Sequence, residues 1–330
     1  MRIAYFDCFS GVIGDMVLGA LLDIGVDFEE LQAELAKLPL TEYAMAAKPV
    51  TRGPIGATKV SVKAVEKGLV RTFSNIRQII EQSDLVPPVK ARSLAIFQRL
   101  AEAQAKVSRK NVETVHFHEV GAIDSVVDIV GTAIGFHLLN VERVYCSPLP
   151  LGLGMIRTEH GMMPVPSPVT LEIIRGVPVY STSMQAELVS PTGAAIVRSY
   201  VNEFGNMPPL TVDRIGYGAG RLDLEVPNVL RLVVGESIES AVGDIATLLT
   251  AIVEKLDDQA RDDLVDKLMR LGALDVWLTT AGRARKQEVV ELNVLAPPDK
   301  EEDLIKAVFE ATPVDDIRVS RRSLRRRPEK

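Results

Sequence analysis

The sequence predicts a mixed α/β (α+β) domain followed by a smaller second domain. Helix-like and strand-like hydrophobic patterns alternate through residues 1–235. Residues 236–243 are small and polar, as is typical of a linker. The pattern then restarts with six elements in the order β-α-β-β-α-β, which is the order of a ferredoxin-like domain. We therefore expect domains at 1–235 and 244–320, with a basic tail at 321–330.

The first domain opens on a short apolar run, residues 3–6, which predicts a buried strand, and an amphipathic helix begins close to Asp15. Asp27 starts a capping-box-like pattern for a second helix. Residues 58–65 alternate apolar and polar side chains, which predicts a strand with Lys59 on its solvated face. Further on, Pro88 opens a helix, helices follow Ser167 and Thr192, and strands are expected at 141–146, 177–180 and 229–234.

In the second domain the expected strands and helices are 245–256, 257–272, 274–280, 289–295, 299–312 and 317–319. The chain then ends in arginines, namely Arg318, Arg321, Arg322, Arg325, Arg326 and Arg327. We expect a disordered basic end, with phosphate contacts to a nucleotide or to RNA as the alternative. No aromatic residues interleave these arginines, which argues against RNA.

Composition excludes several classes of function. A chain of 330 residues with a net charge of −6 gives no general case for binding nucleic acid. Asp7 and Asp15 interrupt the apolar start, so it is not a signal peptide, and no run approaches the roughly 20 apolar residues of a membrane span. Cys8 and Cys146 form no Cys-x-x-Cys pattern, which indicates the reducing cytoplasm. Cys8 is either a soft metal ligand or, more commonly, a small buried thiol.

The turn after the first strand carries a candidate binding site. Asp7 ends the strand, Ser10, Gly11 and Gly14 follow, and Asp15 lies where the helix starts. Free backbone N–H groups at a helix start bind anions, whereas the two acids favour a cation. We predict that the turn holds a phosphate, a metal or both. The alternative is a plain turn in which Asp15 caps the helix.

A second candidate site begins with two of the four histidines, His116 and His118, which are followed by Glu119. In an extended segment, side chains two residues apart point to the same face, and imidazole suits nickel, zinc and copper. Asp124 and Asp128 share one face of the helix predicted next. Because that helix is apolar and a buried unpaired carboxylate is costly, we interpret the segment as a metal or acid–base site. The alternative is a capping Asp124 and a solvated Asp128.

Residues 216–221 are rich in glycine and end in Arg221. No clean helix follows them, so they do not fit a dinucleotide-binding fingerprint. One interpretation is a flexible loop whose backbone approaches a ligand, with Arg221 on an anion. The other is a β-bulge or a hairpin turn.

Seven motifs in one order resemble the LarC nickel-insertion family. They are the stretches 5–16 and 116–128, Ser-Pro-Leu-Pro-Leu-Gly at 147–152, Glu-His-Gly at 159–161, Pro-Val-Pro-Ser-Pro at 164–168, Ser-Pro-Thr-Gly-Ala-Ala at 190–195 and Gly-Tyr-Gly-Ala-Gly at 216–220. The resemblance implies that Ni(II) is inserted into pyridinium-3,5-bisthiocarboxylic acid mononucleotide, with consumption of CTP. The implied product is the nickel-pincer nucleotide cofactor of lactate racemase, which contains a carbon–metal bond.

The resemblance also implies roles for individual residues. Ser10, Gly11 and Gly14, with Asp15 and Arg221, are expected to hold the phosphate of the substrate or an associated metal. His116, His118 and Glu119 are expected to deliver or orient Ni(II), with Asp7 and His160 as further ligands. Asp124 or Asp128 is expected to remove the ring proton that carbon–metal bond formation displaces.

The second domain departs from the family pattern. Where the family carries Glu-Thr-Asn-Ile-Asp-Asp, residues 250–255 read Thr-Ala-Ile-Val-Glu-Lys, so that Glu254 remains but Lys255 replaces an acid. A protonated lysine cannot ligate Mn(II) or Mg(II). Arg283, Arg285 and Lys286 keep the positive charge of the family's basic loop. The resemblance implies that these residues and Glu254 bind CTP with Mn(II) or Mg(II), a site that Lys255 weakens.

We therefore expect a cytoplasmic nickel-inserting enzyme that forms homo-oligomers. Its expected partners are a sulfur-bearing pyridinium mononucleotide and apo lactate racemase, but neither nucleic acid nor a membrane. One alternative is a non-catalytic nickel carrier that no longer uses CTP, which the Lys255 change favours. Another is a metal-dependent phosphohydrolase.

Overall fold

The structure is a computed structural model that describes residues 1–40, 43–64, 71–117, 123–158, 161–238, 244–253, 258–282 and 288–324. The chain forms two compact units, Met1–Ser237 and Ile238–Lys330, and each is described by itself. Among the described helices, none has the length and apolar character that crossing a membrane requires.

The N-terminal unit alternates helices and strands, as the sequence predicts. Its strands are β1 (Arg2–Asp7), β2 (Tyr43–Arg52), β3 (Ile55–Ala64), β4 (Arg71–Thr72), β5 (His116–Phe117), β6 (Arg143–Cys146), β7 (Leu149–Leu151), β8 (Met155–Thr158), β9 (Gly161–Pro164), β10 (Val179–Ser181), β11 (Glu203–Phe204), β12 (Leu210–Ala219) and β13 (Val229–Ser237). Its helices are α1 (Gly14–Asp23), α2 (Phe28–Leu35), α3 (Phe73–Glu81), α4 (Pro87–Ser108), α5 (Ile123–Leu138), α6 (Pro168–Ile173) and α7 (Pro191–Tyr200), with a 3₁₀ turn at Val112–Thr114.

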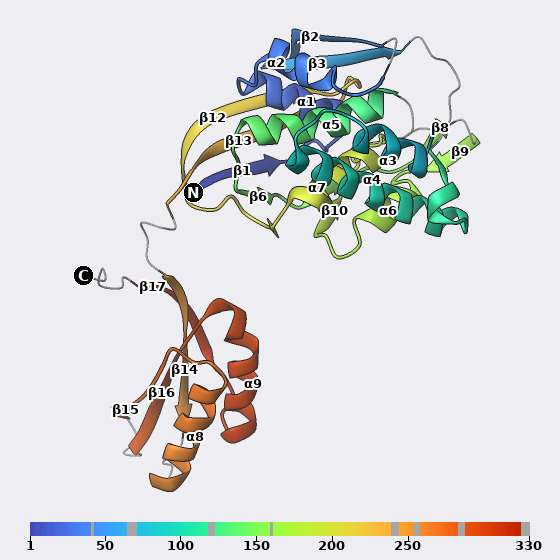
Figure 1. Ribbon diagram of the computed structural model, residues 1–330. Coiled ribbons are helices and arrows are strands. Elements are labelled where there is room, and N and C mark those ends of the chain that lie inside the picture. Colours follow the sequence, from blue (N-terminus) through green and yellow to red (C-terminus); the bar gives the residue numbers. More distant parts are fainter. Residues whose placement is uncertain are drawn as a thin grey trace. The chain divides into compact units, whose positions relative to one another are not determined.

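A seven-stranded mixed sheet in the order β11-β6-β1-β13-β12-β3-β2 forms the centre of this unit (Figure 1). β1 is parallel to β6 and antiparallel to β13. Helix α1 lies against β12, β3 and β13, and α5 packs on α1. The start of α1, which follows the turn after β1, therefore lies in the layer between the sheet and α5.

Glycines inside β12 let α1 approach the sheet closely. A Cβ on Gly218 would lie 1.7 Å from the carbonyl oxygen of Met16, and one on Gly216 would lie 2.3 Å from that of Ala20. The flexible-loop interpretation of this glycine-rich segment is therefore wrong, because it is a strand packed under a helix. The strand ends at Ala219, so that Arg221 follows directly beside α1.

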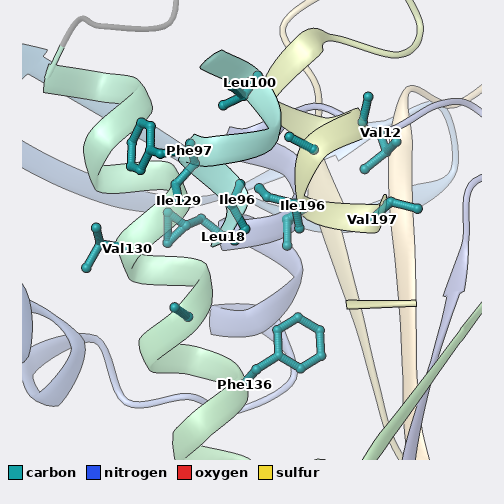
Figure 2. Packing of buried hydrophobic residues seen from close by; sticks show 14 of the residues in the cluster. Val12, Leu18, Ile96, Phe97, Leu100, Ile129, Val130, Phe136, Ile196 and Val197 are labelled. Atoms are coloured by element: carbon teal, nitrogen blue, oxygen red, sulfur yellow. The ribbon is translucent and has the colours of Figure 1, made fainter. Parts of the chain in front are cut away.

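The core of the N-terminal unit lies between the helices and the sheet. Figure 2 shows buried side chains from α1, α4, α5 and α7 packed together, among them Leu18, Phe97, Ile129 and Ile196. Helix α5 is buried along most of its length. A carboxyl group on this helix consequently enters an environment with little water, which bears directly on Asp128.

The sequence analysis missed β2, which pairs with β3 over its whole length. The reason is compositional: β2 contains three alanines and Pro49, residues of low strand propensity. The strand lies at the edge of the sheet, where proline is tolerated because one row of backbone groups needs no ladder partner.

The C-terminal unit has the predicted element order β-α-β-β-α-β. Its elements are β14 (Asp244–Val253), α8 (Asp258–Arg270), β15 (Asp275–Gly282), β16 (Glu288–Ala296), a 3₁₀ turn at Pro298–Lys300, α9 (Glu301–Ala311) and β17 (Arg318–Leu324). The sheet order is β15-β16-β14-β17, and every neighbouring pair is antiparallel. Both helices lie on one face of this sheet (Figure 1), above a core that includes Leu249, Leu268, Leu292 and Leu304.

Strand β17 continues beyond residue 320, where we expected the second domain to end. Arg321 and Arg322 belong to this strand, so the expected disordered tail is wrong for them. The reason is that β14 pairs with β17 from Thr250–Arg318 to Asp244–Leu324 and satisfies the backbone groups of β17 that face β14. The remaining tail, 325–330, lies outside the described residues.

Candidate functional site

The two sequence motifs meet at the N-terminus of α1. Gly14, the first residue of α1, faces Asp128 of α5, and a Cβ on Gly14 would lie 2.6 Å from the Asp128 Oδ2 atom. Glycine at position 14 therefore leaves room for the carboxyl group. The turn after β1 and the helix that follows the histidines form one site, although they are more than a hundred residues apart in the sequence.

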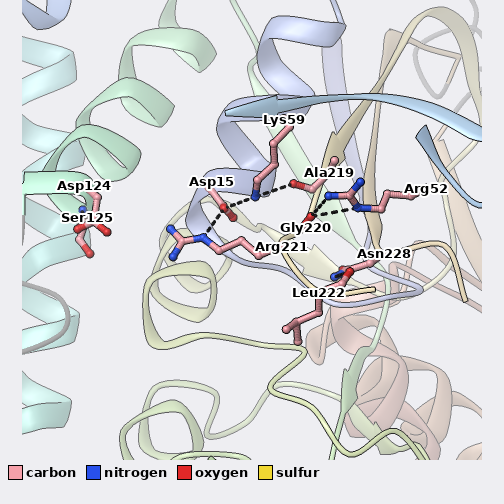
Figure 3. A network of polar contacts seen from close by, with 10 residues as sticks. All are labelled: Asp15, Arg52, Lys59, Asp124, Ser125, Ala219, Gly220, Arg221, Leu222 and Asn228. Atoms are coloured by element: carbon pink, nitrogen blue, oxygen red, sulfur yellow. Dashed lines mark hydrogen bonds and ion pairs between the residues drawn. The ribbon is translucent and has the colours of Figure 1, made fainter. Parts of the chain in front are cut away.

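Two cationic side chains bind the carboxylate of Asp15, whose side chain is only 4% exposed (Figure 3). Its Oδ2 atom accepts hydrogen bonds from Lys59 Nζ at 2.7 Å and from Arg221 Nε at 3.2 Å. Lys59 comes from β3 and also donates to the carbonyl oxygen of Ala219 at 3.3 Å. The Arg221 side chain is 67% exposed, so it covers Asp15 from the solvent side. We call Lys59 and Arg221 the cation clamp.

The backbone on both sides of Arg221 is fixed by further hydrogen bonds. Arg52 donates from Nη2 and Nε to the carbonyl oxygen of Gly220, at 2.9 and 3.3 Å. Asn228 donates from Nδ2 to the carbonyl oxygen of Leu222 at 2.9 Å (Figure 3). The guanidinium therefore extends to Asp15 from a held segment of backbone, while most of its own side chain is exposed to solvent.

Burial raises the pKa of the Asp128 carboxyl well above its usual range. The negative charges of Asp15 and Asp124 raise this pKa further, and Arg221 and Lys59 partly offset the effect. Asp128 thus keeps its proton to a higher pH than an exposed aspartate does. A proton on Asp128 also removes one negative charge from the group formed by Asp15, Asp124 and Asp128, which faces only the two positive charges of the cation clamp.

Three oxygen atoms of this site are buried and, within the described part of the chain, have no hydrogen-bond partner. They are Ser10 Oγ, Asp15 Oδ1 and Asp128 Oδ1. Buried polar atoms in proteins almost always have a partner. Oxygen atoms of this kind accept hydrogen bonds from a substrate or from water, and they are hard donors for a cation.

The turn that precedes α1 uses part of its hydrogen-bonding capacity internally. The Gly11 N–H donates to the carbonyl oxygen of Cys8 at 2.9 Å. Gly11 has a φ of +110°, and a Cβ there would lie 2.1 Å from the carbonyl oxygen of Leu188. Ile13 is the N-cap residue and offers no side-chain cap, so Asp15 does not cap the helix. The N–H groups of Met16 and Val17 donate to the carbonyl oxygen of Ile13, at 3.1 and 3.2 Å.

Asp7 and the two cysteines lie at the same end of β1 and β6. Asp7 accepts a hydrogen bond from Arg231 Nε of β13 at 2.9 Å, and Arg231 Nη2 also contacts it. The Sγ atoms of Cys8 and Cys146 are 3.7 Å apart, and both residues are buried. Burial raises the pKa of the Cys146 thiol well above its usual range, and the hydrogen bond with Cys8 raises this pKa further. This thiol is therefore protonated, which disfavours a role as metal ligand.

The predicted histidine ligands are only partly covered by the structure. His116 lies in β5, which pairs with Thr72 of β4, and Asp124 accepts a hydrogen bond from the Ser125 N–H at 2.8 Å. Within the described ranges, no three His, Cys, Asp or Glu side chains are arranged to hold a metal ion. The predicted site residues His118, Glu119, His160, Glu254, Arg283, Arg285 and Lys286 lie outside the described residues.

Lys59 is the residue of the site that sequence reasoning missed. The alternation of its strand predicts a solvated face, whereas its side chain is only 13% exposed and pairs with Asp15. The sequence gives no signal for this pairing, because Lys59 occupies a polar position in the regular alternation of its strand. Its partner lies 44 residues away, and the pairing depends on how α1 lies against β3.

The Asp15→Ala variant is expected to lower the free energy of unfolding by about 3 kcal/mol, because Lys59 is left buried without a counter-charge. Changing Lys59 to methionine in the same chain should restore most of this stability. Urea denaturation followed by circular dichroism measures the effect, since the single tryptophan, Trp277, lies in the other unit.

Glu113→Ala serves as the control for this prediction. It removes an exposed ion pair with Arg77 of 2.8 Å and should change the free energy by less than about 1 kcal/mol. An equal effect of Asp15→Ala and Glu113→Ala would contradict the importance of the cation clamp for stability.

Comparisons with known proteins agree on one family. The sequence model described as nickel insertion protein matches residues 4–329. A relative from Desulfitobacterium hafniense, named pyridinium-3,5-bisthiocarboxylic acid mononucleotide nickel insertion protein, is 44% identical over 325 residues, which is 97% of this chain and 81% of the relative. A relative from Wolinella succinogenes is 44% identical over 317 residues, covering 94% of this chain and 80% of its own length.

A relative from Dictyoglomus thermophilum is 41% identical over 318 residues, or 96% of this chain and 82% of its own length. Among solved structures, the apo form of LarC2, the C-terminal domain of a cyclometallase involved in the synthesis of the NPN cofactor of lactate racemase, is 18% identical. That likeness covers 25% of this chain and 57% of the other, with a TM-score of 0.24, which is too slight to carry an argument.

Proposed function

This chain belongs to the nickel insertion protein family, and from that membership we propose that it inserts Ni(II) into pyridinium-3,5-bisthiocarboxylic acid mononucleotide. This nucleotide is the compound in the name of its Desulfitobacterium relative. Ni(II) is accordingly a substrate of the reaction. The product is the nickel-pincer nucleotide, and apo lactate racemase is its recipient in the cytoplasm.

The observation that carries this proposal is the convergence of the two motifs at the start of α1. Asp128 of α5 lies against Gly14, and Asp15 lies one residue further along α1. The histidine segment leads into the N-terminus of α5 after only a few residues. A buried pair of carboxyl groups lies at this end of α1 and α5, and we propose that the two histidines supply nitrogen ligands for Ni(II) beside it.

Recognition of the nucleotide is assigned to the cation clamp and the turn before α1. The phosphate and the thiocarboxylates of the substrate are anionic, and Arg221 is the largely exposed cation over Asp15. An anionic group of the substrate can draw the guanidinium away from Asp15 because both partners compete for the same donors. This movement would uncover the carboxyl groups, and the Ser10 hydroxyl would then donate to the bound anion.

Removal of the ring proton is assigned to Asp128. Formation of the carbon–nickel bond displaces a proton from the pyridinium ring, so a base must accept it. The raised pKa makes the Asp128 carboxylate a stronger base than an exposed aspartate. Asp124 is the weaker candidate, because one of its oxygens already accepts a hydrogen bond from its own helix.

For the C-terminal unit, we propose a ferredoxin-like domain that binds CTP with Mn(II) or Mg(II). The βαββαβ order and the antiparallel order β15-β16-β14-β17 support this fold. Val253 and Gly282 are the last described residues before Glu254 and before the basic segment 283–287. They lie at the same end of the sheet, because Val253 pairs with Val290 and Gly282 with Glu288.

The direct test is reconstitution of nickel insertion with the purified full chain. The protein is incubated with the dithio-nucleotide, Ni(II) and CTP, and the mixture is assayed for activation of apo lactate racemase. We expect activation only when all components are present. Failure of the complete mixture, in an assay where the Desulfitobacterium relative succeeds, would overturn the proposed activity.

The Lys255 substitution favours a second candidate, a nickel carrier that no longer uses CTP. The two candidates differ in nucleotide binding, so calorimetric titration with CTP in the presence and absence of Mn(II) separates them. The enzyme is expected to bind CTP more tightly when Mn(II) is present. A chain that binds Ni(II) but shows no heat with CTP under either condition would be a carrier.

A further inference from the structure

The chain contains only two cysteines, and the fold brings them into contact although they are 138 positions apart. The Sγ atoms of Cys8 and Cys146 are separated by 3.7 Å, and both side chains are fully buried. Their spacing gives no Cys-x-x-Cys motif, so only the fold reveals the pair. Two thiols in contact can be joined to a disulfide by a two-electron oxidation.

Cys146 is the fixed member of this pair. It ends β6, which pairs with β1 on one side and with β11 on the other. Its backbone carbonyl oxygen also accepts a hydrogen bond from the Gly205 N–H at 2.8 Å. Its register partner is Phe6, so Cys8 lies two residues further along, past the end of β1. Any movement that brings the two sulfur atoms together is therefore expected at Cys8.

The backbone of Cys8 is connected to the turn before α1. Its carbonyl oxygen accepts the hydrogen bond from the Gly11 N–H at 2.9 Å. The next residue, Val12, donates its N–H to the carbonyl oxygen of Leu188 at 2.8 Å. Ser10, whose hydroxyl belongs to the candidate site, lies between Cys8 and Gly11. A displacement of Cys8 is consequently passed to residues of the candidate site.

We propose that Cys8 and Cys146 form a redox modification site, at which a peroxide converts the two thiols into a disulfide that displaces the turn before α1. One thiol sulfur attacks an oxygen of hydrogen peroxide, the O–O bond breaks, and a sulfenic acid and one water form. The second sulfur attacks the sulfenic sulfur, the S–O bond breaks, and a second water leaves with the proton of the second thiol. The two thiols lose two electrons in total, and hydrogen peroxide is reduced to water.

Burial selects a peroxide as the oxidant. Formation of a disulfide by exchange requires direct contact between a thiol and the sulfur of another disulfide. Both cysteine side chains have 0% exposure, so a bulky disulfide such as oxidised glutathione does not reach them. Hydrogen peroxide is close to water in size and enters through small openings of the fold. We therefore expect peroxide to oxidise the pair far faster than oxidised glutathione does.

Oxidation is expected to slow nickel insertion, an expectation that rests on the proposed function, whereas the disulfide itself does not. The S–S bond is about 2.0 Å long, so the sulfur atoms must approach by roughly 1.7 Å. This approach strains the hydrogen bonds of the turn and moves the Ser10 hydroxyl, which is assigned to the bound anion. Because a misplacement of about 1 Å is costly in catalysis, insertion should slow by at least about tenfold.

The test oxidises the purified full chain with hydrogen peroxide and removes the oxidant by gel filtration. Thiols counted in denaturant should fall from two to none, and a peptide map without reductant should show one peptide that links Cys8 to Cys146. Dithiothreitol should restore both thiols and the insertion rate. It does not reduce methionine sulfoxide, so its effect separates the disulfide from oxidation of the nine methionines. Cys146→Ala, treated in the same way, should give no linked peptide.

Hydrogen exchange measures the displacement of the turn without reference to any activity. The amides of Gly11 and Val12 should exchange at least about tenfold faster in the oxidised chain, because their hydrogen bonds are disturbed. The amides of α3 serve as the internal control and should be unchanged. Peroxide treatment of Cys146→Ala should leave exchange in the turn within about twofold of the untreated variant.

Two outcomes would overturn the proposal. One is the survival of both thiols at peroxide levels that oxidise the exposed Met155 and Met162. The other is a disulfide that changes neither hydrogen exchange in the turn nor the rate of nickel insertion, which would make the pair a structural contact. If the untreated chain inserts no nickel, the proposed function fails, and the thiol count and hydrogen exchange still decide the disulfide.

Discussion

Replacement of Asp128 by asparagine is expected to lower the rate of nickel insertion by about 10²–10⁴-fold, the usual effect of losing a positioned base. Asparagine has nearly the same shape, so the packing against Gly14 is preserved, but its amide cannot take the ring proton. Single-turnover formation of the nickel-pincer nucleotide measures the rate. In the wild type this rate should rise with pH through the raised pKa of Asp128, because only the ionised form accepts a proton.

The same variant has an expected effect on stability with a defined sign. Above about pH 4, the unfolded chain loses the Asp128 proton while the folded protein keeps it. Folded protein then binds more protons than unfolded protein, so the free energy of unfolding falls as pH rises toward the raised pKa. The amide of asparagine does not titrate, so Asp128→Asn should lose less stability over this range than the wild type.

Asp124→Asn is the matched comparison, since Asp124 lies one turn earlier on the same helix. It should reduce the rate far less, because its carboxyl already accepts a hydrogen bond from the Ser125 N–H. If Asp128→Asn inserts nickel at the wild-type rate and changes only the stability profile, Asp128 has a structural role. A loss of rate confined to Asp124→Asn would move the role of base to that residue.

His118→Ala is expected to abolish formation of the nickel product while the fold survives. The reason is the pair of histidines two residues apart, since loss of one imidazole usually destroys the geometry of a metal site. Nickel bound per chain after dialysis, together with product yield, measures the effect. Circular dichroism and the melting temperature should match those of the wild type.

His137→Ala is the control for the ligand role, because His137 is exposed near the C-terminal end of α5. It should bind nickel and form product as the wild type does. Normal yield in His118→Ala would remove His118 from the site. A large fall in its melting temperature would identify a packed histidine instead of a ligand.

Local patterns in the sequence determined most helices of both units and the strands of the C-terminal unit, whereas several short strands of the N-terminal unit and β2 and β12 escaped them. The helix after Pro88 and the strand that ends in Cys146 follow from periodicity and proline placement, which act over a few residues. The order β-α-β-β-α-β was readable for the same reason. The same local reasoning identified Asp15, Asp128 and Arg221 as functional candidates, because acids and a glycine-rich segment stand out against apolar neighbours.

Only the tertiary structure decided which of these candidates meet. Asp128 faces Gly14, and Lys59 and Arg221 converge on Asp15, through the packing of α1 between the sheet and α5. Gly218 brings α1 close to the sheet by backbone contact, which no pattern of side chains encodes. Likewise, the segment 318–324 forms the strand β17 because it pairs with the edge of β14. Contacts between distant segments depend on the summed packing of many residues, whereas periodicity reports only on neighbours along the chain.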